Sequence, residues 1–280
     1  MSQLLQIRPK TRSLLLLLIC LCLSFESSAC NLVMGYRTND RQPLIARAPD
    51  SSGLYKELYT KAASKIGCTL EVIRLPKKRI LRLLQQGAID FYPGFDFTLA
   101  RSKYIYYIFN GLPGGHVGIS RLNFPEITHV DQLNNKVLLL AQGGSDLLSN
   151  LTVNVQKVKI KQPPEINLTQ AVAMLKNHEA DFYIYDIASI SYYLKLNNEN
   201  QIKVHEKCCK GIKPMYLGFS KKSKHILLTK KINYDPQLST SINNYPQELS
   251  GGSIAERFQQ VLKEMHFEGE IKRIYKKYYQ

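Results

Sequence analysis

Residues 81–101 read LRLLQQGAIDFYPGFDFTLAR, a stretch that runs from a helix into a strand and then into a polar loop. Leucines recur at helical spacing, and Gly87 follows them as a stop. Residues 88–92 are a short apolar run around one aspartate, which is typical of a buried strand. The loop beyond this strand contains Gly94 and ends at Thr-x-x-Arg, with the arginine at position 101. This order of elements predicts an α/β chain.

The helix-to-strand unit has a second copy further along the chain. Residues 172–177 lead into residues 180–184, which read ADFYI and repeat the Asp-Phe-Tyr phrase of residues 90–92. Residues 110–115, the stretch richest in turn-forming residues, separate the two copies. A chance echo of so few residues is the alternative. The positions of the copies favour two similar lobes, each with a mostly parallel sheet flanked by helices.

The remaining apolar patterns extend this alternation to both ends of the mature chain. Apolar residues at helical spacing, each series closed by a glycine, precede short strand-like runs. Ser253 and Glu256 form a capping box that opens a C-terminal helix. The expected elements include residues 76–87 for the helix of the first copy and, outside the two copies, residues 31–35, 54–66, 69–74, 253–262 and 271–279.

The first 29 residues have the features of a secretory signal. Three basic residues precede an apolar core at residues 14–23, and Ser-Ser-Ala at 27–29 suits a cleavage site. This core is well short of the roughly 20 residues that a membrane-spanning helix needs. We therefore expect cleavage and a mature chain that starts at Cys30 in the periplasm. An uncleaved anchor is one alternative; lipidation of Cys30 is another, disfavoured because no aliphatic residue stands three positions upstream.

The mature chain is strongly basic. Loss of the signal, with Arg8, Lys10, Arg12 and Glu26, changes the formal net charge from +16 to +14. Such a charge could indicate nucleic acid or anionic lipid. The basic residues are scattered, however, and export makes nucleic acid unsuitable as a partner. A broadly basic surface or an anionic solute fits better.

Four cysteines remain after export, namely Cys30, Cys68, Cys208 and Cys209. Their even number in an exported chain suggests disulfides, with three possible connectivities. Because Cys30 begins the first expected strand and Cys68 precedes its neighbour in the sheet, we favour a bond between these two. The adjacent pair would form a vicinal disulfide or remain two thiols. Metal binding is disfavoured, since no histidine stands at ligand spacing beside them.

Residues 81–101 resemble the extracellular solute-binding proteins of family 3, the receptors for polar amino acids in ABC uptake systems. The shared pattern is a helix, a glycine, an Asp-containing strand, a glycine loop, and then Thr98 and Arg101. The resemblance extends through most of the mature chain, in residues 130–133, 142–143, 180–186, 216–223 and 271–279.

The resemblance implies the two-lobed type II periplasmic-binding-protein fold, with the ligand in a cleft between the lobes. The chain then crosses from lobe 1 to lobe 2 and returns. Lobe 1 comprises residues 30–112 and 214–280, and lobe 2 comprises residues 113–213. The implied function is a monomer that captures an amino acid or related small carboxylate and presents it to an ABC permease in the inner membrane.

The resemblance gives Arg101 the central binding role, because its family counterpart clamps the α-carboxylate of the solute. A guanidinium suits this role, since its paired donors match the two oxygens of a carboxylate. Thr98 would add a hydroxyl or cap the segment that presents Arg101. Asp186 falls where family members often place the carboxylate that receives the solute's ammonium. The plain structural alternatives are a surface ion pair for Arg101 and a helix cap for Asp186.

Five further residues are candidates for the cleft. Gly144 and Ser145 precede an expected short helix whose N–H groups would hold an anion, with a plain loop as the alternative. Lys77 stands where the family usually has an aromatic residue, and Asp96 where Ser or Thr is common. These two side chains would read a charged solute or pair with each other. Tyr36 would supply the missing aromatic wall, unless it lies in the core or at the rim.

We expect no enzyme activity, no cofactor and no metal site. The chain lacks Gly-x-Ser-x-Gly, His-Glu-x-x-His and a phosphate-binding Gly-Lys-Ser/Thr loop, and its six histidines form no cluster. Two alternatives remain. One is a ligand sensor or interaction protein without a transport role. The other is an enzyme resembling cyclohexadienyl dehydratase, in which Asp96 and Asp186 would do acid–base work.

Overall fold

A computed structural model describes residues 30–140, 158–164, 166–209 and 211–279. The strands are β1 (Cys30–Tyr36), β2 (Cys68–Arg74), β3 (Phe91–Phe95), β4 (Ile105–Arg121), β5 (Val137–Leu139), β6 (Lys159–Lys161), β7 (Phe182–Asp186), β8 (Ile202–His205), β9 (Gly211–Ser220), β10 (Leu228–Lys230) and β11 (Gln247–Leu249). The helices are α2 (Leu54–Lys65), α3 (Lys77–Gln86), α4 (Leu99–Ser102), α6 (Leu168–Lys176), α7 (Ile187–Leu196), α8 (Ile254–Phe267) and α9 (Glu270–Tyr279), with a 3-10 turn η1 (Val130–Leu133).

The main sheet is mixed and follows the order β2-β1-β3-β9-β4-β7-β5-β6, with β8 also paired to β4. β1 is parallel to β3, and β5 is parallel to both β6 and β7. β9 is antiparallel to both of its neighbours, β3 and β4, and β4 is antiparallel to β7. The predicted parallel pairs therefore lie in the outer parts of the sheet. The centre differs because β4 and β9 carry the chain across the molecule in opposite directions.

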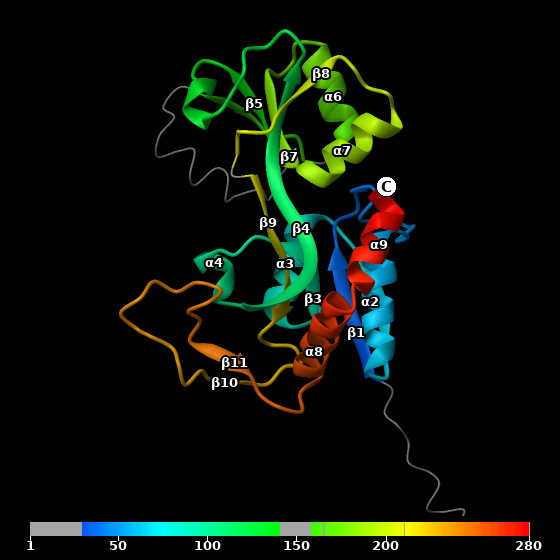
Figure 1. Cartoon of the computed structure of the whole chain (residues 1–280), viewed down its shortest axis with the longest axis vertical. Coiled ribbons are helices and arrows are strands. Elements are labelled where there is room, and N and C mark those ends of the chain that lie inside the picture. Colours follow the sequence, from blue (N-terminus) through cyan, green and yellow to red (C-terminus); the bar gives the residue numbers. More distant parts are fainter. Residues whose placement is uncertain (1–29, 141–157, 165, 210, 280) are drawn as a thin grey trace, which may run out of the picture. The chain divides into compact units, whose positions relative to one another are not determined.

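These two long strands lie side by side over most of their length (Figure 1). Their register shifts between Phe109 and Pro113, within the turn-rich stretch that the sequence marks. Beyond the shift Pro113 faces Pro214, and neither proline has an amide N–H to give to the ladder. The predicted lobe boundaries fall at this pair of prolines, and they remain a prediction.

Asn110 supports the backbone at the register shift. Its side chain is fully buried, and its amide nitrogen donates to the hydroxyl of Tyr59 and to the carbonyl of Pro93. Its Oδ1 accepts from the N–H of Leu112. One buried side chain thus satisfies groups in β3 and β4 that the interrupted ladder does not pair.

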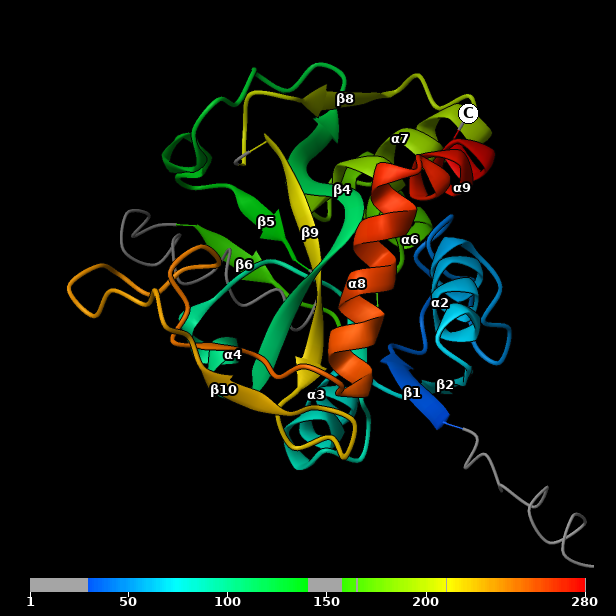
Figure 2. The same cartoon turned by 60° about the horizontal axis from the view of Figure 1, so that its bottom comes forward.

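Helices α2, α8 and α9 pack against one another (Figure 2). α2 also contacts β2, and both α8 and α9 contact β4. Ser253 caps α8, because its Oγ accepts from the N–H of Glu256 at 3.2 Å. Its own N–H donates to the carbonyl of Ser250, so only one of the two hydrogen bonds of the predicted capping box is present. Phe258 on α8 is fully buried, and its ring contacts those of Tyr59 and Phe91. The apolar face predicted for this helix is therefore part of the core.

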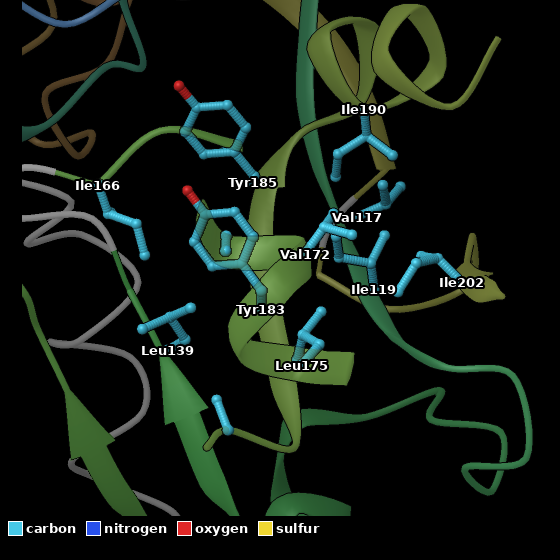
Figure 3. Packing of buried hydrophobic residues seen from close by; sticks show 12 residues of the cluster. Val117, Ile119, Leu139, Ile166, Val172, Leu175, Tyr183, Tyr185, Ile190 and Ile202 are labelled. Carbon is cyan, nitrogen blue, oxygen red and sulfur yellow. The ribbon is translucent and has the colours of Figure 1, made fainter. Parts of the chain in front are cut away.

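A hydrophobic core packs against one face of β7 (Figure 3). Because successive strand residues face opposite sides, Tyr183 and Tyr185 share one face, and their rings stack 5.3 Å apart. Val172 and Leu175 of α6 pack in the same cluster. This packing fixes the end of β7, where Asp186 stands.

All four cysteines of the described chain are in disulfide bonds. Cys30 pairs with Cys68, as expected from their places on neighbouring strands β1 and β2. Cys208 and Cys209 form a vicinal disulfide that is buried beside Phe124 and Phe182. Among the described residues, no helix has the length and apolar character needed to span a membrane.

Candidate functional site

One pocket gathers residues from the loop after β1, the start of α3, the end of β3, the middle of β4 and the end of β7. It encloses about 100 Å³, enough for several water molecules or one small solute. Its charged lining residues, within the described part of the chain, are Arg37, Arg41, Lys77, Asp96, Arg101 and Asp186.

Arg101 reaches the pocket from the short helix α4. Thr98 caps this helix with its Oγ1, which accepts from the N–H of Arg101 at 3.2 Å. The Arg101 side chain is 8% exposed, and its guanidinium lies 4.8 Å from the centre of the Phe95 ring. The stacking holds the guanidinium in place, and its Nη1 also donates to the backbone carbonyl of Asp96 at 3.5 Å.

Asp186 is the last residue of β7, and its carboxylate both caps α7 and forms an ion pair. Its Oδ1 caps α7 by accepting from the N–H and the hydroxyl of Ser189, at 2.9 and 2.8 Å. Its Oδ2 lies 3.0 Å from Nη2 of Arg41. The carboxylate is 1% exposed, so this ion pair is shielded from solvent. The cap predicted as an alternative is present, and Arg41 holds the oxygen that remains.

Sequence reasoning missed Arg41 and its neighbour Arg37. Both follow β1 in the segment YRTNDRQ, where two arginines four positions apart were the available signal. A two-way backbone bridge between Arg41 and Ile45 sets the shape of this loop. The guanidinium of Arg41 also lies 5.3 Å from the centre of the Tyr185 ring. Tyr185 of β7 therefore supports the side chain of Arg41 through a cation–π contact.

Asp96 pairs within the pocket with residues other than Lys77. Lys213 of β9 lies 3.0 Å from its Oδ2, and Nδ1 of His116 lies 3.7 Å away. Burial lowers the pKa of His116, and the nearby charge of Asp96 only partly opposes this shift. The imidazole is thus neutral at pH 7, and Lys213 is the main charge partner of Asp96. Sequence reasoning identified neither Lys213 nor His116.

The other predicted site residues have different positions. Thr98 acts as a cap and does not line the pocket, whereas Lys77 does. Tyr36 is fully buried, stacked on Tyr92 with ring centres 5.0 Å apart, so it lies in the core behind the pocket. Gly144 and Ser145 lie outside the described residues.

The arrangement suits recognition of a small anion. Four cationic and two carboxylate side chains are among the described residues that line the pocket. Met215, Leu140 and Ile184 add apolar surface. No group of three or more His, Cys, Asp or Glu residues in the described part of the chain could hold a metal ion. The lining side chains offer a solute charge pairing and apolar packing.

No protein-family model and no curated protein sequence matches this chain. Solved structures do share its fold. The substrate-binding protein of an amino acid ABC transporter is 18% identical, covers 89% of this chain and 99% of its own, and has a TM-score of 0.65. The GluR0 ligand-binding core in complex with L-glutamate is 13% identical, covers 91% and 100%, and has a TM-score of 0.67.

A histidine kinase sensor domain with similarity to periplasmic binding proteins is also alike, with 16% identity, 89% and 96% coverage and a TM-score of 0.65. At these identities the likeness shows the fold alone. The chain has the two-lobed α/β fold of the periplasmic binding proteins, as the sequence predicts.

Proposed function

We propose that this chain is an exported solute-binding protein that captures an amino acid or related small carboxylate for an ABC-type uptake system. The observation that carries the proposal is the pocket where Arg101 and Asp186 meet, although they are far apart in sequence. The similar structures include an amino acid ABC transporter's substrate-binding protein and a ligand core with bound L-glutamate, which supports this class of solute.

Arg101 is the proposed carboxylate clamp. It is buried, and it is fixed by its cap and by Phe95. In a site that excludes water, a bidentate pair between its guanidinium and a carboxylate is strong. The solute would also contact groups at the end of β7, which belong to the predicted second lobe. Such a solute favours the closed arrangement because only closure completes its contacts.

A thermal-shift screen of amino acids and small organic acids tests the proposal. A true solute at 100 times its dissociation constant should raise the free energy of unfolding by about 2.7 kcal/mol. The tightest solute is then titrated by calorimetry into the wild-type chain and the Arg101→Ala variant. We expect the variant to lose about 2–5 kcal/mol of binding free energy, because it removes a buried charge partner.

Lys103→Ala is the matched control, since Lys103 is an exposed cation two positions away from Arg101. It should bind the solute like the wild type. Equal binding by Arg101→Ala and the wild type would disprove the clamp. No response to any amino acid or organic acid would disprove the solute class.

A sensing role is the second candidate, and the likeness to a histidine kinase sensor domain favours it. Both roles use the same pocket and differ in what the closed chain contacts. Adjacent permease and ATPase genes would support transport, whereas their absence would support sensing. Export at residues 1–29 stays a prediction, which N-terminal sequencing of the secreted chain would test by finding Cys30 first.

A further inference from the structure

Arg37 is a half-buried cation without a carboxylate partner among the described residues. It lines the pocket, and its Nε is buried and has no hydrogen-bond partner. Its surroundings are aromatic, since its guanidinium lies 5.9 Å from the centre of the Tyr36 ring. A hydrogen bond joins Arg37 to Tyr92, but a neutral hydroxyl does not balance the guanidinium charge. A guanidinium keeps its charge in such surroundings, so the absence of an anionic partner is costly. An anionic group in the pocket would remove that cost.

Whereas Arg37 lacks an anionic partner, Asp186 already has a cationic partner in Arg41. The ion pair of 3.0 Å takes one carboxylate oxygen, and Ser189 takes the other through two hydrogen bonds. A solute ammonium would have to displace Arg41 from this buried carboxylate. The side chain of Arg41 is itself only 10% exposed and its Nε has no partner, so displacement would leave a second unpaired cation.

Asp96 offers no substitute for Asp186. Lys213 lies 3.0 Å from it, and His116 shares the same oxygen. Within the described residues, both pocket carboxylates are therefore engaged, while Arg37 lacks an anionic partner. A solute that matches these charges carries a second negative group in addition to one carboxylate, and it carries no positive group.

We propose that Arg37 binds a second acidic group, so that the solute is a small diacid without an ammonium group. The proposal rests on the function proposed above, with Arg101 holding the first carboxylate. Arg37 then explains why one carboxylate is not enough. Arg41 explains why an amino group is rejected: it neutralises the carboxylate that an ammonium needs.

Matched solutes test this specificity in the intact mature chain. Calorimetry compares succinate, butyrate and aspartate, and then glutarate, valerate and glutamate, so that length is constant within each set. We expect the diacid of the better-fitting length to bind at least tenfold more tightly than the monoacid and the amino diacid of that length. Equal or tighter binding of aspartate or glutamate would overturn the proposal.

Two substitutions assign the effect to the named side chains. Arg37→Gln should remove the preference for diacid over monoacid, whereas Arg37→Lys should keep part of it. Arg41→Gln should change the ratio of amino diacid to diacid affinity by at least tenfold in favour of the amino diacid, because Asp186 becomes available. This gain cannot result from misfolding. Arg47→Gln removes an exposed cation from the same loop and should leave both ratios unchanged.

The outcomes separate this inference from the function on which it rests. Tight, Arg101-dependent binding of amino acids would refute the diacid and keep the solute-binding function. No binding of any acid or amino acid would refute both. An unchanged diacid-to-monoacid ratio in Arg37→Gln would refute the role of Arg37. If a variant fails to fold, the wild-type ratios decide.

Discussion

At the scale of single residues, the hydrogen bonds of the buried His205 determine which protonation state of its ring is stable. His205 is fully buried, and its Nδ1 accepts from the backbone N–H of Ile127 at 3.1 Å. The ring proton is therefore on Nε2, which lies 2.8 Å from the hydroxyl of Ser120. Protonation of Nδ1 would remove the acceptor that Ile127 uses. Burial and this hydrogen bond therefore favour the neutral form of the imidazole.

Stability should consequently depend on pH below neutrality. Burial lowers the pKa of His205, and Glu126 opposes this shift only in part. As pH falls below about 6.5, the unfolded chain takes up the proton first, so the free energy of unfolding decreases. Urea titrations between pH 7.5 and 5.5 should show this loss, with a smaller slope in His205→Gln. The exposed His178, changed to Asn, is the control. A wild-type slope in His205→Gln would contradict the explanation.

The sequence predicts those pocket residues that lie in or beside a recognisable local motif. Arg101 and Asp96 belong to the stretch 81–101, and Asp186 follows the second Asp-Phe-Tyr copy. For Arg37 and Arg41 the only local signal is their spacing of four positions, which is weak because the loop after β1 has no periodicity. Its shape depends on the Arg41–Ile45 bridge and on contacts with the distant β7. Such non-local contacts leave no spacing in the sequence.

At the scale of elements, the pairing of β4 with its neighbours depends on a close approach. Gly118 of β4 faces Ile184 of β7, and a Cβ at this glycine would overlap the ring of Phe182. Phe182 is fully buried beside the vicinal disulfide, so its ring cannot move aside cheaply. The sequence predicts the strand, but nothing in its apolar pattern predicts this contact.

Gly118→Ala should therefore destabilise the chain by about 1–3 kcal/mol through overpacking. The same change at Gly251, where a Cβ would meet nothing within 4 Å, is the matched control. Denaturant unfolding of the two variants measures the difference. Equal stability of Gly118→Ala and the wild type would show that the sheet accommodates the methyl group.

At the scale of the whole molecule, the fold was more predictable than the sheet order. Alternating helices and strands and the repeated phrase predict an α/β chain with two similar units. They do not predict that β4 and β9 join the units through one central antiparallel pair. That pairing links residues more than 90 positions apart in sequence, such as Phe109 and Tyr216. Only the folded chain reveals it.

The net charge of the mature chain should act on association. At a formal charge of +14, a basic surface attracts a dianion over distances set by salt, with a Debye length of about 30 Å at 0.01 M and about 8 Å at 0.15 M. We expect the association rate constant for a diacid to fall over this range and that for a zwitterion to change little. Stopped-flow kinetics measures both. A diacid rate that is independent of salt would contradict electrostatic steering.

The most direct test of the central claim is a structure of the mature chain bound to the tightest solute from the acid panel. The account predicts one carboxylate within hydrogen-bond distance of the Arg101 guanidinium, in the pocket that Asp186 also lines. A second acidic group at Arg37 would support the diacid. A solute bound outside this pocket, or bound in it without contact to Arg101, would contradict the account.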